Sequence, residues 1–217
     1  MIKKILVAAA VAAATIGAQA STNLVANGGF DGSTSGYVYN GDPASVAALH
    51  IGIPIQAGTV ADWSGSFVSI TSSSSPWGTP SSLSGFNAAT FGGYIAGVQS
   101  DAVLSQSLDL AAGTYLLTWS DANRGADQNY AVSFGGTTYH SYTTVGGAGW
   151  NTEALQFTTT GGIGELSFTG GTLFKNTDAT SFIDNVSLTA AVPEPASLLM
   201  MAVGTLGLLA WRRRAQV

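Results

Sequence analysis

Apolar and polar side chains alternate at every second position along much of the chain from residue 94 onward. The alternation is clearest in Gly113 to Ser120, Gln128 to Phe134 and Ser181 to Leu188. It continues in two shorter runs, which contain Leu155 with Phe157 and Leu166 with Phe168. Successive side chains of a strand point to opposite faces, so this period is typical of strands with one buried face. The pattern predicts a set of antiparallel strands around one core.

Glycine pairs interrupt these runs at Gly135-Gly136, Gly161-Gly162 and Gly170-Gly171. Tight hairpin turns need positive φ angles, which glycine adopts without strain, so the pairs predict at least two hairpins. No long stretch between residues 21 and 192 repeats apolar residues every three to four positions, so helices there should be short or absent. Many short strands joined by glycine turns predict an all-β fold, an antiparallel jelly-roll β-sandwich.

The N-terminus has the features of a secretory signal peptide. Lys3 and Lys4 supply a positive region, and Ile5 to Ile16 is almost wholly apolar. Ala18-Gln19-Ala20 is a small-x-small cleavage site. A buried N-terminal helix, the alternative, would need a polar face, which this segment lacks.

The C-terminus consists of Pro193-Glu194-Pro195, an apolar run ending at Trp211, and the basic cluster Arg212-Arg213-Arg214. This order resembles the PEP-CTERM sorting signal of exported Gram-negative bacterial proteins. As a helix, residues 193–211 nearly reach the roughly 30 Å of a membrane core, and the arginines would stay cytoplasmic. The resemblance implies cleavage near the Pro-Glu-Pro block by an exosortase-type enzyme, although the same residues would also serve as a permanent single-pass anchor.

The two ends divide the chain into three parts. We expect a signal peptide at residues 1–20, a β-sandwich domain at 21–190 and a sorting segment at 191–217, with a transmembrane helix at 193–211 and a basic tail at 212–217. The domain would be held at the inner membrane and, after processing, would reach the cell surface or the extracellular matrix.

The segment between the two ends, residues 21–192, is acidic. It contains eleven acidic and two basic residues, a net charge of −9 with histidine neutral. Binding to phosphates depends on clustered lysine and arginine, so nucleic acid is excluded as a partner. The chain has no cysteine, nucleophile elbow, phosphate-binding loop or histidine spacing typical of transition-metal sites. We therefore expect no enzyme activity.

Two short motifs bracket the domain: Asn23-Leu24-Val25-Ala26-Asn27-Gly28-Gly29-Phe30-Asp31 at its start and Ser181-Phe182-Ile183-Asp184-Asn185-Val186-Ser187-Leu188 at its end. An N-L-x-x-N-G-x-F opening closed by an F-I-D-N-V strand looks like the galactose-binding-like jelly rolls, which include many carbohydrate-binding modules. The resemblance covers residues 23–189 and implies this fold, with a glycan as the ligand class.

Asp184 has the same parity in the last strand as the apolar residues Phe182 and Val186, so it should point toward the core. A buried carboxylate needs a counter-ion or a proton. In the related modules a structural Ca²⁺ joins the acidic residue after the opening motif to that of the last strand, and by motif these positions are Asp31 and Asp184. The alternative is that Asp184 accepts backbone N–H groups at a bulge and that Asp31 is a turn residue.

An aromatic and polar cluster at a strand end is the predicted ligand site. Sugars are commonly recognised by an aromatic ring that covers their C–H face and by polar side chains that bond their hydroxyl groups. The alternative is that the tryptophans belong to the core and that Arg124 pairs with a neighbouring aspartate. The residues of the hypothesis are two strand aromatics, three polar neighbours and two loop tryptophans: Trp119, Tyr130, Asp121, Asn123, Arg124, Trp77 and Trp150.

The leading hypothesis is a non-enzymatic exported protein, associated with extracellular polysaccharide and stabilised by one structural Ca²⁺. The main alternative is a structural biofilm matrix or adhesive component without sugar specificity. An ice-binding protein and a polysaccharide hydrolase are the remaining alternatives. The threonine clusters form no regular repeat, and no carboxylate pair is marked by the sequence.

Overall fold

The computed structural model of the 217-residue chain describes residues 22–31, 37–40, 56–57, 60–71, 79–99, 101–123, 125–171 and 180–191. The segment Thr22–Ala191 forms one compact unit. The predicted signal peptide, the predicted transmembrane helix with its sorting residues, Trp77 and Arg124 lie outside the described residues. Among the described residues, no helix is long and apolar enough to cross a membrane.

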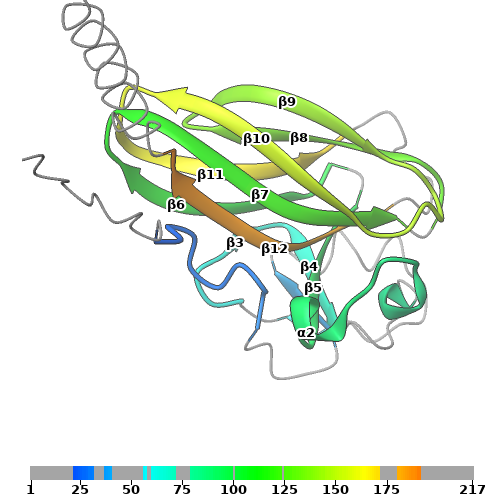
Figure 1. Cartoon of the computed structure of the whole chain (residues 1–217). Helices are drawn as coiled ribbons and strands as arrows, with labels where there is room; N and C mark the ends of the chain where they lie inside the picture. The colour runs from blue at the N-terminus through cyan, green and yellow to red at the C-terminus, as the bar shows by residue number, and fades with distance from the viewer. Residues whose placement is uncertain are drawn as a thin grey trace, which may run out of the picture. The chain divides into compact units, whose positions relative to one another are not determined.

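Two β-sheets make up the fold (Figure 1). In spatial order, the seven-stranded sheet contains β10 (Asn151–Thr159), β7 (Gly113–Asn123), β12 (Thr180–Ala190), β5 (Tyr94–Gln99), β4 (Phe67–Thr71), β1 (Tyr37–Asn40) and β2 (Gln56–Ala57). The five-stranded sheet contains β3 (Ser64–Gly65), β6 (Val103–Leu110), β11 (Gly162–Gly170), β8 (Gln128–Phe134) and β9 (Thr137–Thr144). The helical elements of the described residues are the short helix α2 (Ala88–Phe91) and the 3₁₀ turn η1 (Pro80–Ser82).

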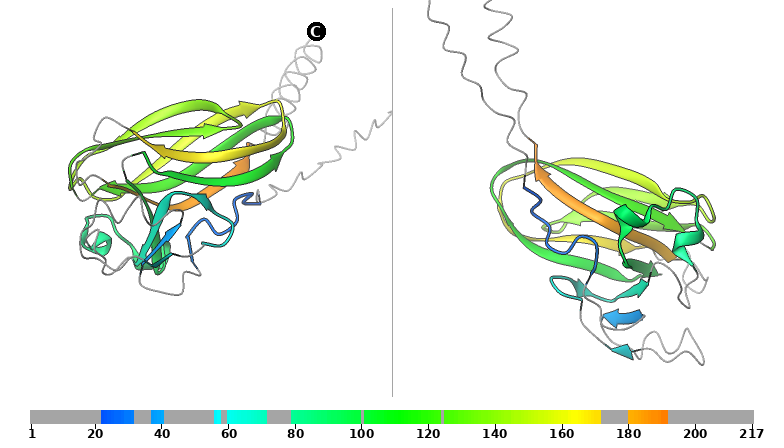
Figure 2. Two further views of the ribbon diagram at one scale, coloured as in Figure 1. Left: turned by 180° about the vertical axis from the view of Figure 1, so that it is seen from behind. Right: turned by 60° about the horizontal axis from the view of Figure 1, so that its bottom comes forward.

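Neighbouring strands are antiparallel except for β1 and β2, which are parallel. After β5 the chain changes sheet at nearly every connection: β6, β8, β9 and β11 belong to the smaller sheet, and β7, β10 and β12 to the larger one. Figure 2 shows the two layers from two further directions. The antiparallel jelly-roll sandwich predicted from the alternation is confirmed, and the strands marked by the pattern are β7, β8, β10, β11 and β12.

Two of the three glycine pairs lie at turns, and one of these two closes a hairpin, whereas Gly170 is the last residue of β11. Gly135 and Gly136, with φ angles of 55° and 79°, join β8 to its neighbour β9. Gly161 and Gly162 instead carry the chain from β10 in one sheet to β11 in the other. The prediction of at least two hairpins at these pairs is therefore wrong, because a glycine pair permits a sharp turn without specifying which sheet the next strand joins.

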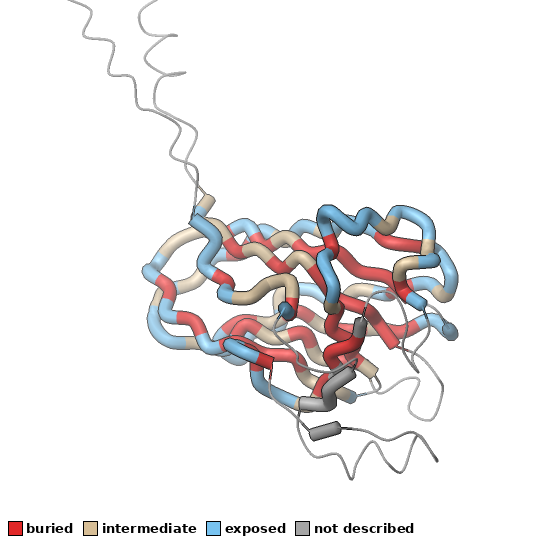
Figure 3. The backbone as a smooth tube through the Cα atoms, turned by 90° about the horizontal axis from the view of Figure 1, so that it is seen from below, coloured by how far each residue is buried: buried red, intermediate tan, exposed pale blue. Residues whose placement is uncertain are grey.

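The core lies between the sheets and is built from the inward-facing residues of both. In β8, buried and half-buried residues alternate along the whole strand. The largest fully buried side chains include Trp119, Tyr130 and Phe168. In Figure 3 buried, intermediate and exposed residues alternate along much of the described chain. Both core clusters lie within residues 25–188, so the segment 22–191 carries its own core.

Candidate functional site

The N-terminal segment runs beside β12 and is tied to it by hydrogen bonds. The N–H of Leu24 donates to the Leu188 carbonyl (2.8 Å), and the N–H of Leu188 donates to Asn23 Oδ1 (2.9 Å). Further along, the N–H of Val186 donates to the Gly28 carbonyl (3.0 Å). These bonds join the first motif of the domain to the last, across a sequence separation of 165 residues between Asn23 and Leu188.

Gly28 and Asn27 give the first motif its shape. A Cβ atom at position 28 would lie 2.0 Å from the Val186 carbonyl oxygen, so only glycine allows this close approach. Asn27 has a φ of 47°, in the left-handed region. Its Nδ2 donates to the carbonyls of Asp31 (2.9 Å) and Ala61 (3.1 Å). The motif therefore forms a turn, and Asp31 stands at its end.

Asp184 lies at a break in the pairing of β12 with β7. The register shifts between Asp184 and Ser187, and Asn185 has a φ of 57°. The side chain of Asp184 is fully buried, as its parity predicted. Its Oδ1 accepts the N–H of Asn185 (2.7 Å), whereas its Oδ2 has no hydrogen-bond partner. The bulge alternative thus accounts for one carboxylate oxygen and leaves the other as a buried acceptor without a donor.

The carboxylates of Asp31 and Asp184 converge on the same glycine. A Cβ atom on Gly29 would lie 3.4 Å from Asp31 Oδ2 and 3.9 Å from Asp184 Oδ1, and one on Gly92, after α2, would lie 3.5 Å from Asp31 Oδ1. Burial raises the pKa of Asp184 to about 9; the hydrogen bond from Asn185 opposes this rise, and the charge of Asp31 adds to it. Two charged carboxylates here repel each other.

Two converging carboxylates with an unsatisfied oxygen suit a hard cation. Calcium takes about six to eight oxygen ligands from carboxylates, backbone carbonyls and water. A cation would cancel the repulsion between Asp31 and Asp184 and would give Asp184 Oδ2 a partner. The described part of the chain contains no group of three or more His, Cys, Asp or Glu side chains placed to hold a metal. The other oxygens of such a site would therefore come from the backbone and from water.

Three of the residues expected to bind a sugar, Trp119, Asp121 and Tyr130, lie inside the sandwich. Trp119 and Tyr130 are each 1% exposed, and Asp121 is 3% exposed. Trp119 Nε1 donates to the Tyr130 hydroxyl (2.7 Å), which donates to Asp121 Oδ2 (2.6 Å). Burial raises the pKa of Asp121 to about 6; the charge of Glu153 adds to this rise, and hydrogen bonds from Tyr130 and Asn151 oppose it. Trp119 is therefore a core residue, because its parity faces the second sheet.

Asn123 and Trp150 also have structural positions. Asn123 is fully buried, and its Nδ2 donates to the Thr144 carbonyl (3.2 Å), which ties the end of β7 to β9. Trp150 is 9% exposed and donates from Nε1 to the Pro80 carbonyl (3.0 Å). Its ring centroid lies 4.4 Å from that of Phe91. Trp150 thus belongs to the smaller of the two core clusters, as the alternative drawn from the sequence has it. The other buried residues of this cluster are Ile70, Phe91, Ile95, Ala122 and Phe182.

The open edge of the sandwich, formed by β9 and β10, carries a polar surface that the sequence did not single out. β9 lies at one edge of the smaller sheet and β10 at one edge of the larger sheet. The Tyr139 hydroxyl donates to the Thr158 carbonyl (3.0 Å) across the gap between them. Tyr139 and Tyr142 are half-buried there, and Glu153 is the only acidic residue of the two strands. The exposed residues with hydroxyl groups on β9 and β10 are Thr137, Thr138, Ser141, Thr143, Thr152 and Thr158.

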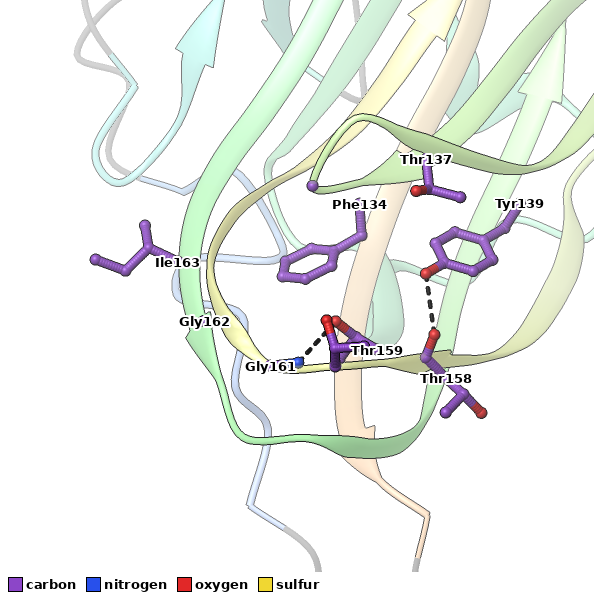
Figure 4. Close-up of a pocket in the computed structure, with 10 residues that line it drawn as sticks. Phe134, Thr137, Tyr139, Thr158, Thr159, Gly161, Gly162 and Ile163 are labelled. Atoms are coloured by element: carbon purple, nitrogen blue, oxygen red, sulfur yellow. Dashed lines mark hydrogen bonds between the residues drawn. The ribbon is translucent and has the colours of Figure 1, made fainter.

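A pocket of about 290 Å³ opens at one end of this edge (Figure 4). It lies between the turn from β8 to β9 and the turn from β10 to β11, and ten residues line it, none of them charged. Figure 4 shows the rings of Phe134 and Tyr139 and the side chain of Thr159 around the same space, whereas the Ile163 side chain points away. The glycine pairs and threonines that line the pocket were visible in the sequence. No local pattern, however, showed that the turn after β8 and the turn after β10 meet around one pocket.

Comparison with known proteins identifies the C-terminal segment. Residues 191–214 match the model of the PEP-CTERM protein-sorting motif, which marks the chain as an exported protein processed at the membrane. The match begins at Ala191, directly after the end of β12. No curated protein sequence matches the chain.

Solved structures similar to this one include carbohydrate-binding modules. The CBM36-1 domain of a multidomain xylanase from the hindgut metagenome of Trinervitermes trinervoides is 15% identical, with a TM-score of 0.39, over 45% of this chain and 79% of that chain. TmCBM61 in complex with beta-1,4-galactotriose is 21% identical, with a TM-score of 0.44, over 79% of this chain and 100% of that chain.

A family 35 carbohydrate-binding module from Clostridium thermocellum is 17% identical, with a TM-score of 0.39, over 50% of this chain and 87% of that chain. The match over residues 191–214 confirms the sorting signal predicted from the sequence, and the arrangement of the strands in two sheets confirms the predicted β-sandwich. At these identities the likeness concerns the fold alone.

Proposed function

We propose that this chain is an exported, non-enzymatic protein whose β-sandwich binds a glycan outside the inner membrane. The observation that carries the proposal is the chemistry of the open edge, with its exposed hydroxyl groups, two half-buried tyrosine rings and one acidic residue. Hydroxyl groups both donate and accept hydrogen bonds, and aromatic rings pack on the C–H faces of sugars. An uncharged, polyhydroxylated partner complements all three features.

Delivery to the surface depends on the C-terminal segment. The sorting motif begins where β12 ends, so loss of the segment from residue 193 onward removes no strand of the sandwich. We infer that an exosortase-type enzyme cuts near Pro193-Glu194-Pro195 and that the domain then joins the cell surface or the extracellular matrix.

Mass spectrometry of the protein in cell fractions tests this processing. The native protein should lose its C-terminal segment, and a chain with alanine at Pro193, Glu194 and Pro195 should keep its full C-terminus in the membrane fraction. A native protein that keeps its full C-terminus in the membrane would show a permanent anchor and contradict processing.

A structural Ca²⁺ is part of the proposal. Asp31 and Asp184 would hold it through their carboxylate oxygens, and the ion would fasten the N-terminal turn to β12. The proposal is supported by the buried Oδ2 of Asp184, which lacks a hydrogen-bond donor, and by the approach of both carboxylates to Gly29. A cation would supply the positive charge that is scarce in a domain with two basic residues.

Affinity electrophoresis tests glycan binding by the purified segment 22–191, which carries its own core. We expect slower migration in at least one gel that contains a neutral polysaccharide, relative to a non-binding control protein, and no release of reducing sugars. If no polysaccharide of a broad neutral and acidic panel slows the domain, direct glycan binding is contradicted and a structural matrix role is favoured.

A further inference from the structure

The pocket at the end of the open edge has the size and chemistry of a small-molecule site. Its volume of about 290 Å³ lies just below the range of roughly 300–1,000 Å³ found for drug-sized ligands, so it has room for a single small group. None of its ten lining residues is charged. A charged ligand would lose hydration there without gaining an ion pair, so the pocket favours a neutral one. Five lining residues carry hydroxyl groups: Thr137, Tyr139, Thr158, Thr159 and Thr160.

Both aromatic rings of the pocket are held by contacts within the fold. A Cβ atom on Gly164 would lie 2.8 Å from Phe134 Cζ, so this glycine lets the ring approach the β11 backbone. The Phe157 ring centroid lies 5.8 Å from that of Phe134 and 4.9 Å from that of Tyr139. The bond from the Tyr139 hydroxyl to the Thr158 carbonyl fixes the second ring further. Side chains that are already fixed lose little entropy when a ligand binds.

The hydroxyl groups of the pocket keep hydrogen-bonding capacity for a ligand. Thr159 Oγ1 accepts the N–H of Gly161 (3.2 Å), which leaves its O–H available as a donor. The Tyr139 hydroxyl donates to the Thr158 carbonyl and can still accept a bond. Thr137 is exposed at the rim. The pocket therefore offers donors and acceptors next to apolar rings, which matches the hydroxyl groups and C–H face of a sugar.

Glycine keeps the rim of the pocket open on both turns. Gly135 and Gly162 line it with φ angles of 55° and 104°, and a Cβ atom on either would meet nothing within 4 Å.

We propose that this pocket is the subsite for one neutral sugar residue of the bound glycan. The inference rests on the glycan binding proposed above. It adds where on the domain the glycan binds, the charge class of the bound sugar and the side chains that contact this sugar. Phe134 and Tyr139 cover the C–H face, and the hydroxyl groups of Tyr139 and Thr159 bond the sugar.

Affinity electrophoresis of the segment 22–191 tests the subsite, with xylan, galactan or β-glucan as neutral probes and polygalacturonate as an acidic probe. Tyr139→Ala removes a ring and a hydroxyl, and Thr159→Val removes one hydroxyl. Each should weaken binding to the neutral probe about tenfold or more. Thr90→Val is the matched control, because Thr90 is exposed on α2 and neither lines the pocket nor lies on the open edge. It should bind as the native domain does.

Circular dichroism melting shows whether each variant is folded, and Tyr139→Phe, which keeps the ring, replaces Tyr139→Ala if the latter is unfolded. Unchanged neutral-glycan binding in Thr159→Val and in the folded Tyr139 variant would overturn the subsite and leave the proposed function standing. Binding to polygalacturonate alone would overturn the neutral ligand class. A native domain that binds no probe would overturn the subsite and the proposed function together.

Discussion

Asp121 and Asp184 lie on neighbouring strands of the same sheet, β7 and β12, and both are buried. Asp121 accepts the Tyr130 hydroxyl, and its pKa rises to about 6. Asp184 faces a second carboxylate, Asp31, and one of its oxygens has no donor; its pKa rises to about 9. Burial is the main cause of both rises, and the neighbours of the two carboxyl groups differ: Tyr130 and Asn151 donate hydrogen bonds to Asp121, whereas the charge of Asp31 raises the pKa of Asp184 further. A buried carboxylate with donors is structural, whereas one that faces another carboxylate indicates a cation.

Among the changes that separate the surroundings of Asp184 from those of Asp121, Gly28→Ala should have the largest effect on stability. The added Cβ would meet the Val186 carbonyl oxygen, so the N-terminal turn must move from β12 and carry Asp31 away from Asp184. We expect the free energy of unfolding to fall by about 3 kcal/mol or more, measured by urea denaturation. Gly93→Ala is the control, since a Cβ there meets nothing within 4 Å, and it should change stability by less than about 0.5 kcal/mol. Equal effects would contradict the role of Gly28.

Calcium removal should have the next largest effect. At about one hundred times its dissociation constant, a bound ion stabilises the native state by about 2.7 kcal/mol, or about 5–10 °C in melting temperature for a domain of this size. Differential scanning fluorimetry with millimolar calcium or with a chelator measures the shift. Asp184→Asn should abolish it, and the matched Asp121→Asn should retain it. An identical native melting temperature in both buffers would remove the metal from the proposal.

Tyr130→Phe should remove the hydroxyl donor of Asp121 and lower the stability of the domain. The change deletes the hydroxyl between Trp119 Nε1 and Asp121 Oδ2 and leaves two buried polar atoms short of a partner, at a cost of about 2 kcal/mol. The calcium shift should remain. Tyr142→Phe is the control, because the Tyr142 ring stacks on Tyr130 at 5.5 Å and is only half-buried. A loss as large in Tyr142→Phe would show that the effect does not depend on the hydrogen bonds of the Tyr130 hydroxyl to Trp119 and Asp121.

The two aspartates should also give different pH windows in calcium-free buffer. A raised native pKa means that the unfolded chain releases its proton first, so stability falls as pH rises from about 4 toward the native pKa. The fall ends near pH 6 for Asp121 and continues to about pH 9 for Asp184. Each group contributes a slope of at most about 1.4 kcal/mol per pH unit.

Asp184→Asn should therefore flatten the stability profile between pH 6 and pH 9, and Asp121→Asn should flatten it only below pH 6. Urea denaturation at a series of pH values, with chelator present, measures both profiles. A native profile that is already flat above pH 6 would show that Asp184 ionises normally in the absence of metal.

Local patterns predicted where the strands lie better than which strands pair with each other. Alternation marked β7, β8 and the last three strands, because a half-buried strand repeats its environment every two residues. The glycine pair at Gly161-Gly162 marked a turn, but the change of sheet there depends on strand pairing far along the chain. The parity of Trp119 placed it on one face without showing that Tyr130 from the second sheet would cover that face.

Four properties could be predicted from the amino-acid sequence, because each follows from composition or from a pattern of adjacent residues: the all-β class, the acidic charge, the sorting motif and the inward position of Asp184. The hydroxyl donor of Asp121 and the approach of Asp184 to Asp31 became visible in the folded chain alone. The tertiary structure also brought the turns at Gly135 and Gly161 together around one pocket. These outcomes depend on contacts between distant segments, and no local pattern encodes which segments become neighbours.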